Sequence, residues 1–254
     1  MHKNLRKTLA IILSTSVVTI GACISNIKNI YADSNSTINI CYDNSYENII
    51  ESEQRKIAYI TIDDGPSKYT DTIINTLNKY GAKATFFMID RNMKTYPEQV
   101  KNIINNGNTA GFHSVSHDIH ELYKSNVSAK KEFDQNKETF HDITNLESNI
   151  IRLPYGSKPY TPTKSYEMLV EAGYKLWDWD LDTQDWKSNS VQIVENVKRY
   201  TENKKEVIIL IHEKKQTVEA LDGILKHLTE QGYDIIPIEQ DQQPQNFWIG
   251  NLYK

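Results

Sequence analysis

Cysteine is scarce in this chain of 254 residues, which contains only Cys23 and Cys41. Two thiols cannot form the several bridges that hold small disulfide-rich domains together, so that class of scaffold is excluded. If the chain is cleaved after Ala32, Cys41 is the only thiol left and no internal disulfide can form. The fold must therefore depend on a hydrophobic core.

The chain also lacks a strong excess of charge of either sign. Its formal net charge is -4, from 29 Lys and Arg against 33 Asp and Glu, and this balance gives no indication of a nucleic-acid partner. Hydrophobic residues make up 39% and charged residues 24%, which is typical of a globular protein. The length allows one large domain or two small ones.

A long hydrophobic run is missing as well. The uncharged apolar stretch 9–22 follows a basic start, which is typical of an export signal, and it is short for a membrane span. Residues 20–23 (IGAC) resemble a lipoprotein cleavage site, which would place a lipid on Cys23, whereas residues 30–32 (IYA) resemble an ordinary signal-peptidase site. An uncleaved anchor is the third interpretation. All three predict an extracytoplasmic protein, secreted or anchored to the outer face of a bacterial membrane.

The chain divides into three parts by composition. Residues 1–32 are interpreted as a signal peptide or a lipoprotein signal or anchor, and residues 33–52, rich in Ser, Asn and Asp, as a polar linker. Residues 53–254 are predicted to form the folded domain.

In this domain, strand patterns alternate with helical patterns. Strands are predicted at 57–62, 84–89, 108–112, 150–153, 174–181, 207–212 and 233–238. Helices are predicted at 70–80, 97–106, 128–144, 161–172, 190–200 and 217–230. Alternation predicts an α/β fold of about seven parallel strands covered by helices, either an open doubly wound sheet or a (β/α) barrel. In both, the functional site forms at the C-terminal ends of the strands.

Polar side chains follow five of these strands at that end. They are Asp63 and Asp64, His113 and His117, Arg152 and Tyr155, Asp182, Asp185 and Trp186, and finally His212. Polarity distributed at random over a surface would not favour one end of each strand, so these residues are candidates for one common site.

The spacing of His113 and His117 points to a metal. We expect the segment to form a helical turn, on which side chains four residues apart share a face. Two imidazoles with one carboxylate make a three-ligand site with open positions, which suits catalysis. Zinc is the first expectation, although the same ligands also suit iron(II). A structural histidine pair is the alternative, and the remaining histidines, including nearby His120, are expected to be solvated or structural.

Asp63 and Asp64 end the first strand. Because successive side chains of a strand point to opposite faces, the two carboxylates are expected to do different jobs, one on the metal and one on the substrate. An ordinary Asp-Gly-Pro turn is the alternative. Arg152 can hold a carboxylate by a planar two-point contact and so orient Asp63, unless it is a plain surface arginine.

The last candidates combine carboxylates with a histidine. A carboxylate that accepts a hydrogen bond from a histidine raises the pKa of that histidine and fixes its tautomer. Asp182 and Asp185 are both candidates for this role, with a solvated acidic loop as the alternative. His212 ends the most apolar strand, so it is either a hydrogen-bonded core histidine or a catalytic one, and its position at the C-terminal end of the strand favours catalysis.

Together the segments resemble the motifs of the polysaccharide deacetylases of carbohydrate esterase family four, the NodB-homology domain. The matching residues are 61–66 (TIDDGP), 113–117 (HSVSH), 152–156 (RLPYG), 182–186 (DTQDW) and 210–212 (LIH). Ile62 stands where the family usually has Phe, and Leu153 where Pro is common. The segments occur in the family's order over about residues 57–240, and no departure removes a functional group.

The resemblance implies a distorted (β/α) barrel and a bound divalent metal, with zinc first and Co2+, Ni2+, Fe2+ or Mn2+ as alternatives. It assigns metal binding to Asp64, His113 and His117. It makes Asp63 the general base, oriented by Arg152.

For the remaining residues, the resemblance makes His212 the general acid, tuned by Asp182, with Asp185 as the alternative partner. The backbone N–H of Tyr155 helps to stabilise the oxyanion. Trp186 and Leu210 shape an apolar pocket for the acetyl methyl group.

The activity that this resemblance implies is removal of N-acetyl groups from amino sugars of a polysaccharide. For an exported protein we expect peptidoglycan N-acetylglucosamine first, with chitin oligomers, an exopolysaccharide or acetylated xylan as alternatives. A glycosidase, which would leave the histidine pair without a role, and a non-catalytic wall-binding module rank lower. We expect a monomer without a nucleic-acid partner that contacts a membrane only through its N-terminus.

Overall fold

The computed structural model describes residues 55–252. The predicted signal at 1–32 and linker at 33–52 lie outside the described residues and stay predictions. Within the described part, no helix is both long enough and apolar enough to cross a membrane.

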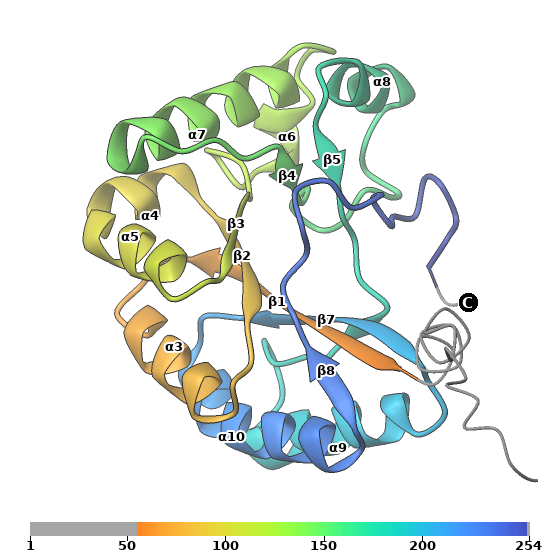
Figure 1. Ribbon diagram of the computed structural model, residues 1–254. Coiled ribbons are helices and arrows are strands. Elements are labelled where there is room, and N and C mark those ends of the chain that lie inside the picture. Colours follow the sequence, from red (N-terminus) through yellow and green to blue (C-terminus); the bar gives the residue numbers. More distant parts are fainter. Residues whose placement is uncertain (1–54, 253–254) are drawn as a thin grey trace, which may run out of the picture. The chain divides into compact units, whose positions relative to one another are not determined.

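Parallel strands form one curled sheet at the centre of this domain (Figure 1). They are β1 (Lys56–Gly65), β2 (Ala84–Met88), β3 (Thr109–Phe112), β4 (Ile150–Ile151), β5 (Lys175–Leu176), β6 (Leu181–Asp182), β7 (Glu206–His212) and β8 (Tyr233–Ile235). The strand order is β5-β4-β3-β2-β1-β7-β6, and β8 pairs with the start of β1. The prediction of a distorted (β/α) barrel is confirmed.

Helices cover the outside of this sheet (Figure 1). They are α3 (Thr70–Lys79), α4 (Asp90–Thr95), α5 (Pro97–Asn105), α6 (Ile119–Leu122), α7 (Ser128–Thr144), α8 (Thr163–Glu171), α9 (Ser190–Thr201) and α10 (Lys215–Glu230). All six predicted helices are present, and the short helices α4 and α6 are additional. Local signals set several ends: Asn189 and Gln192 form a capping box at the start of α9, and α7 ends at Asn145 in the left-handed conformation.

The predicted strand 174–181 is divided between the two edges of the sheet. The Trp177 N–H donates to the Ile151 carbonyl at 2.9 Å, whereas the Asp180 N–H donates to the Ile208 carbonyl at 2.9 Å. The first part of the segment thus pairs beside β4 and the second part beside β7. One short stretch of chain therefore links both edges and partly closes the barrel.

Alternation along β1 separates the core from the site. Ala58, Ile60 and Ile62 are fully buried against the helices, and complete burial of an isoleucine side chain stabilises a fold by about 1.5–3 kcal/mol. The odd-numbered residues of β1 face the inside of the curled sheet. There, Tyr59 packs in a second, smaller cluster that includes Trp177. Asp63 follows this inner series and thereby reaches the C-terminal end of the barrel.

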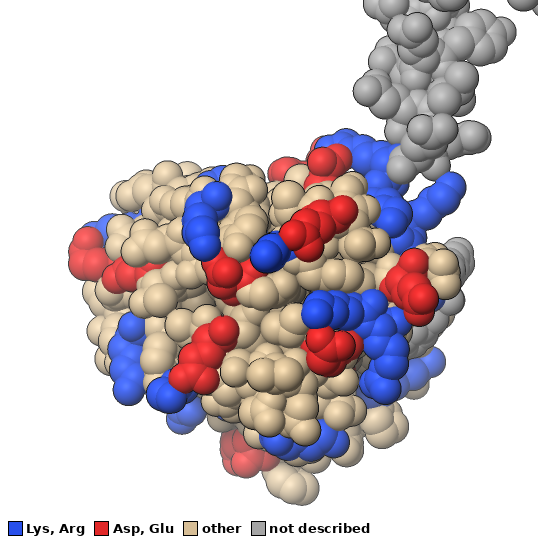
Figure 2. Space-filling model, turned by 90° about the horizontal axis from the view of Figure 1, so that it is seen from below, with Lys and Arg blue, Asp and Glu red and all other residues tan. Residues whose placement is uncertain are grey.

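Charge on the outer surface is mixed in sign. In the view from below, basic and acidic side chains are interspersed among uncharged residues (Figure 2). Several form ion pairs, such as Lys79 of α3 with Asp222 of α10, and Lys215 with Glu219 on α10. Exposed pairs of this kind contribute little to stability.

Candidate active site

Three of the predicted residues form a compact cluster of metal-ligand type. Ligand atoms of Asp64, His113 and His117 lie within 4.8 Å of one another. Asp64 Oδ1 is 3.4 Å from His117 Nε2 and 3.8 Å from His113 Nε2. His113 Nδ1 donates to the Arg152 carbonyl at 2.8 Å, and since a carbonyl only accepts, the lone pair of His113 is on Nε2, facing Asp64.

The chemistry of this cluster fits a divalent cation. Asp64 Oδ1 is buried and has no hydrogen-bond partner among the described residues, although a buried oxygen without a partner is costly. Burial acts to raise the pKa of Asp64, but the charges of His113, His212 and His117 outweigh it and lower that pKa. Burial, followed by the charge of His113, lowers the pKa of His117. Anionic Asp64 and neutral His117 are the forms that bind metal.

The two histidines do not lie on a helical turn, so that prediction is wrong. They belong to the loop between β3 and α6, in which Ser114 and His117 have φ of 69° and 52°. Glu132 of α7 holds the loop by accepting the N–H groups of Val115 and Ser116, both at 2.9 Å, and the Ser116 hydroxyl at 2.8 Å. Sequence reasoning missed Glu132 because it lies in a helix and not after a strand.

The prediction of opposite faces for Asp63 and Asp64 is also wrong. The pairing of β1 with β2 shifts register between Asp63 and Gly65, and Asp64 has a φ of 72°. This bulge turns both carboxylates into one cavity. Their contacts nevertheless differ, because Asp63 is bound by Arg152 whereas Asp64 faces the imidazoles.

Arg152 is completely buried and is not a surface arginine. Its Nη1 donates to Asp63 Oδ1 at 2.9 Å and to Thr61 Oγ1 at 2.7 Å. Its Nε and Nη2 donate to the carbonyls of Trp177 and Asp178. The contact with Asp63 thus uses one donor instead of the expected two, and the other donors fix the guanidinium in place.

Asp185, and not Asp182, is the carboxylate that holds His212. The fully buried Asp185 accepts His212 Nδ1–H at 2.7 Å and the His212 backbone N–H at 2.6 Å. Burial acts to lower the pKa of His212, but the hydrogen bond to Asp185, then the charges of Asp63, Asp185 and Asp64, raise it above its ordinary value. His212 Nε2 is left as the free end of the ring.

Asp182, the residue first expected in this role, makes a local turn. Its Oδ1 accepts the Gln184 N–H at 2.8 Å. Gln184 has a φ of 57°, and this turn carries the chain from β6 to Asp185. Asp182 still lines the cavity, but the structure gives it no contact with His212.

A cavity of 490 Å³ collects these groups at the C-terminal ends of the strands. It is lined by Asp63, Asp64, His113, His117, Tyr155, Tyr160, Trp179, Asp182, Trp186, Leu210, His212 and Lys214. Leu210 is buried, whereas Tyr155, Tyr160 and Trp186 are about half exposed at the rim. The sequence did not single out Tyr160, Trp179 or Lys214, and exposed His120 does not line the cavity.

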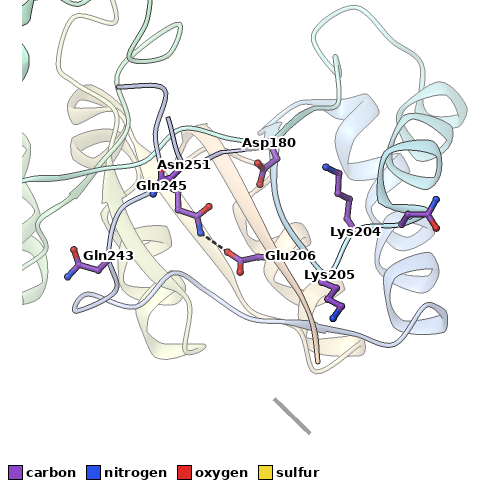
Figure 3. A pocket seen from close by; sticks show the side chains of 8 residues that line it. Asp180, Lys204, Lys205, Glu206, Gln243, Gln245 and Asn251 are labelled. Atoms are coloured by element: carbon purple, nitrogen blue, oxygen red, sulfur yellow. Dashed lines mark hydrogen bonds between the residues drawn. The ribbon is translucent and has the colours of Figure 1, made fainter. Parts of the chain in front are cut away.

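A larger cavity of 620 Å³ lies near the start of β7 (Figure 3). It is lined by Asp180, Asn203, Lys204, Lys205, Glu206, Gln243, Gln245 and Asn251. Glu206 there accepts a hydrogen bond from Gln245 at 2.6 Å. This lining contains neither histidine nor cysteine, so the smaller cavity is the better candidate for chemistry.

Comparison with known proteins agrees with this geometry. Residues 50–177 match the family model described as polysaccharide deacetylase. A peptidoglycan-N-acetylglucosamine deacetylase of Bacillus cereus is 37% identical over 207 residues, 78% of this chain and 76% of that protein. The peptidoglycan-N-acetylmuramic acid deacetylase PdaC of Bacillus subtilis is 32% identical over 76% of this chain and 40% of its own length. The crystal structure of the polysaccharide deacetylase Bc1974 from Bacillus cereus has a TM-score of 0.74 and 38% identity, covering 78% of this chain and 99% of that one.

Proposed function

This chain belongs to the polysaccharide deacetylase family, and from that premise we propose that it hydrolyses the N-acetyl groups of N-acetylglucosamine in peptidoglycan. One observation carries the proposal. A single cavity brings a carboxylate held by Arg152 and an imidazole held by Asp185 together with a cluster of three metal-ligand residues. Amide hydrolysis needs this combination of a base, an acid and an electrophile.

Asp64, His113 and His117 would hold the divalent metal, for which zinc is our first choice. Such an ion polarises a carbonyl and lowers the pKa of a bound water. The loop held by Glu132 and the bulge at Asp64 fix these ligands before any substrate arrives.

Asp63 acts as the general base. Its Oδ1 is engaged by Arg152, while Oδ2 lies 3.6 Å from His113 Nε2, beside the metal cluster. Oδ2 is therefore the atom that takes the proton from the attacking water. Arg152 keeps Asp63 in this orientation.

His212 acts as the general acid. Asp185 binds Nδ1–H, so a proton on Nε2 is directed to the cavity and can pass to the leaving amine of the sugar. The backbone N–H of Tyr155, in a turn with a φ of 64°, donates to the acetyl oxygen as that oxygen gains charge. Acetate and a free amino sugar are the products.

The lining of the cavity suits an acetylated sugar. Buried Leu210 offers an apolar contact for the acetyl methyl group beside Trp186. The exposed rings of Tyr155, Tyr160 and Trp186 can pack against sugar faces. Several similar proteins are named for peptidoglycan, and the predicted export signal would bring this enzyme to the cell wall, which supports peptidoglycan over chitin, an exopolysaccharide or xylan.

Acetate release from purified peptidoglycan and from chitin oligomers tests the proposal. We expect release that a chelator abolishes and added zinc restores. Asp63→Asn and His212→Ala should each lower turnover on the order of 10²–10⁴-fold, while metal stays bound. New reducing ends without acetate would instead indicate a glycosidase, and polymer binding without acetate a binding module. Full activity of either variant would refute the assigned roles.

A further inference from the structure

One side chain in the cavity has no part in the reaction described above. Lys214 lies two residues after His212, directly before α10, and it is half-buried. Among the described residues that line the cavity, it is the only lysine or arginine. The lining also contains the carboxylates of Asp63, Asp64 and Asp182.

The ammonium of Lys214 has no partner of its own in the part of the chain that the structure describes. No carboxylate there lies within 4.0 Å of it, and none of the side-chain hydrogen bonds of residues 55–252 involves it. The next residue behaves differently, because Lys215 is 76% exposed and forms an ion pair with Glu219 at 2.6 Å. The charge of Lys214 does reach the site, since it contributes to lowering the pKa of Asp64.

A half-buried cation that forms no ion pair among the described residues, in a cavity that receives a ligand, suits an anionic group on that ligand. A charge-assisted hydrogen bond to a carboxylate is stronger than one to a neutral oxygen. Chitin offers no such group. In peptidoglycan each N-acetylglucosamine is followed by a muramic acid, whose lactyl carboxyl group is an amide where a stem peptide is attached and a free carboxylate where the peptide has been removed. The carboxylates of Asp63 and Asp182 in the lining disfavour an anion, and Lys214 can offset this repulsion near its own position.

We propose that Lys214 recognises a carboxylate on the sugar next to the one that is deacetylated, and so makes the enzyme selective for acidic N-acetylated glycans over neutral ones. This inference rests on the proposed function of the same site. Lys214 acts here on substrate binding and not on the chemical step. Its removal should therefore raise KM for the acidic substrate and leave kcat nearly unchanged.

The test compares Lys214→Met with Lys215→Met, a matched change of the neighbouring lysine that points away. The substrates are peptide-free glycan strands with free lactyl carboxylates, the same strands with these groups converted to neutral methylamides, and chitin oligomers. For Lys214→Met we expect KM to rise about tenfold on the acidic strands and to stay within about twofold on both neutral substrates. Lys215→Met should match the unmodified enzyme on all three.

Salt gives a second readout. Because salt screens a partly exposed charge pair, rising NaCl should increase KM of the unmodified enzyme on acidic strands, and this dependence should flatten in Lys214→Met. An equal loss on acidic and neutral substrates would overturn the inference, since Lys214 would then act on the site as a whole. Unchanged kinetics on every substrate would overturn it too. No acetate from any glycan with the unmodified enzyme would instead refute the proposed function.

Discussion

At the scale of single residues, a hydrogen bond sets the protonation of the general acid. Asp185 accepts two donors of His212 and also the Thr217 hydroxyl at 2.6 Å. Its charge favours the imidazolium, which is the form that can donate a proton. Because the pKa of His212 is raised, this form persists to higher pH than in an unperturbed histidine.

Replacement of Asp185 by Asn should therefore move the pH dependence of turnover. Without the charge, the pKa of His212 falls, the imidazolium is lost at lower pH, and the alkaline limb of the kcat profile shifts to lower pH. Turnover at neutral pH should drop on the order of 10²-fold. Asp182→Asn is the matched control and should leave the alkaline limb in place. A shift in the control alone would show that Asp182 tunes the acid after all.

The sequence places both Asp182 and Asp185 at the site, but it does not show which of the two contacts His212. Asp182 and Asp185 follow the same strand within a few residues, and both satisfy the rule that polar groups cluster at strand ends. What distinguishes them is the turn at Gln184, where the positive φ directs Asp185 to His212. A positive φ in a residue other than glycine is not readable from the residue type.

At the scale of elements, α7 supports the metal-binding loop. Glu132 accepts two backbone N–H groups and a hydroxyl of that loop, and Asn136, one helical turn further on, donates to the Ser114 carbonyl at 3.1 Å. The loop contains two residues with positive φ, so its own conformational preferences do not hold it in shape. The helix supplies the missing constraint.

Glu132→Gln should loosen this loop and weaken metal binding. An amide cannot accept the loop's donors with a full negative charge, and loss of a group that supports metal ligands typically costs about 10–100-fold in metal affinity. Zinc affinity, measured by competition with a chromophoric chelator, checks this. Glu138→Gln removes an exposed carboxylate of the same helix and should leave the affinity unchanged. Equal affinities of both variants would show that the loop holds its shape without the charge of Glu132.

At the scale of the whole molecule, the layer arrangement followed from the sequence, whereas closure of the barrel did not. The spacing of apolar residues along the sequence located the long strands and the helices, because each of these elements buries a continuous apolar face. The sequence of segment 174–181 (YKLWDWDL) predicts one strand because apolar and aromatic residues recur along its whole length. In the fold it changes partners midway, from β4 to β7, and such a change depends on distant strands. The two histidines likewise converge through loop geometry and not through the predicted helical turn.

Metal binding at the junction of β1 and the β3–α6 loop should stabilise the entire domain. An ion that binds only the folded state adds roughly 2.7 kcal/mol at a concentration of 100 Kd. For a domain of about 200 residues this corresponds to a rise in Tm of roughly 5–10 °C. Differential scanning calorimetry of the chelated protein, with and without added zinc, measures the shift. His117→Ala should abolish it, because one of three ligands is lost.

His120→Ala is the matched control for this measurement. His120 is exposed and lies three residues beyond His117, outside the cavity, so its loss should leave the zinc-dependent rise in Tm intact. A rise that persists in His117→Ala but disappears in His120→Ala would place the ion outside the cluster of Asp64, His113 and His117. The assignment of the reactive site would then lose its physical basis, because Asp63 would no longer lie beside the ion that would activate the attacking water.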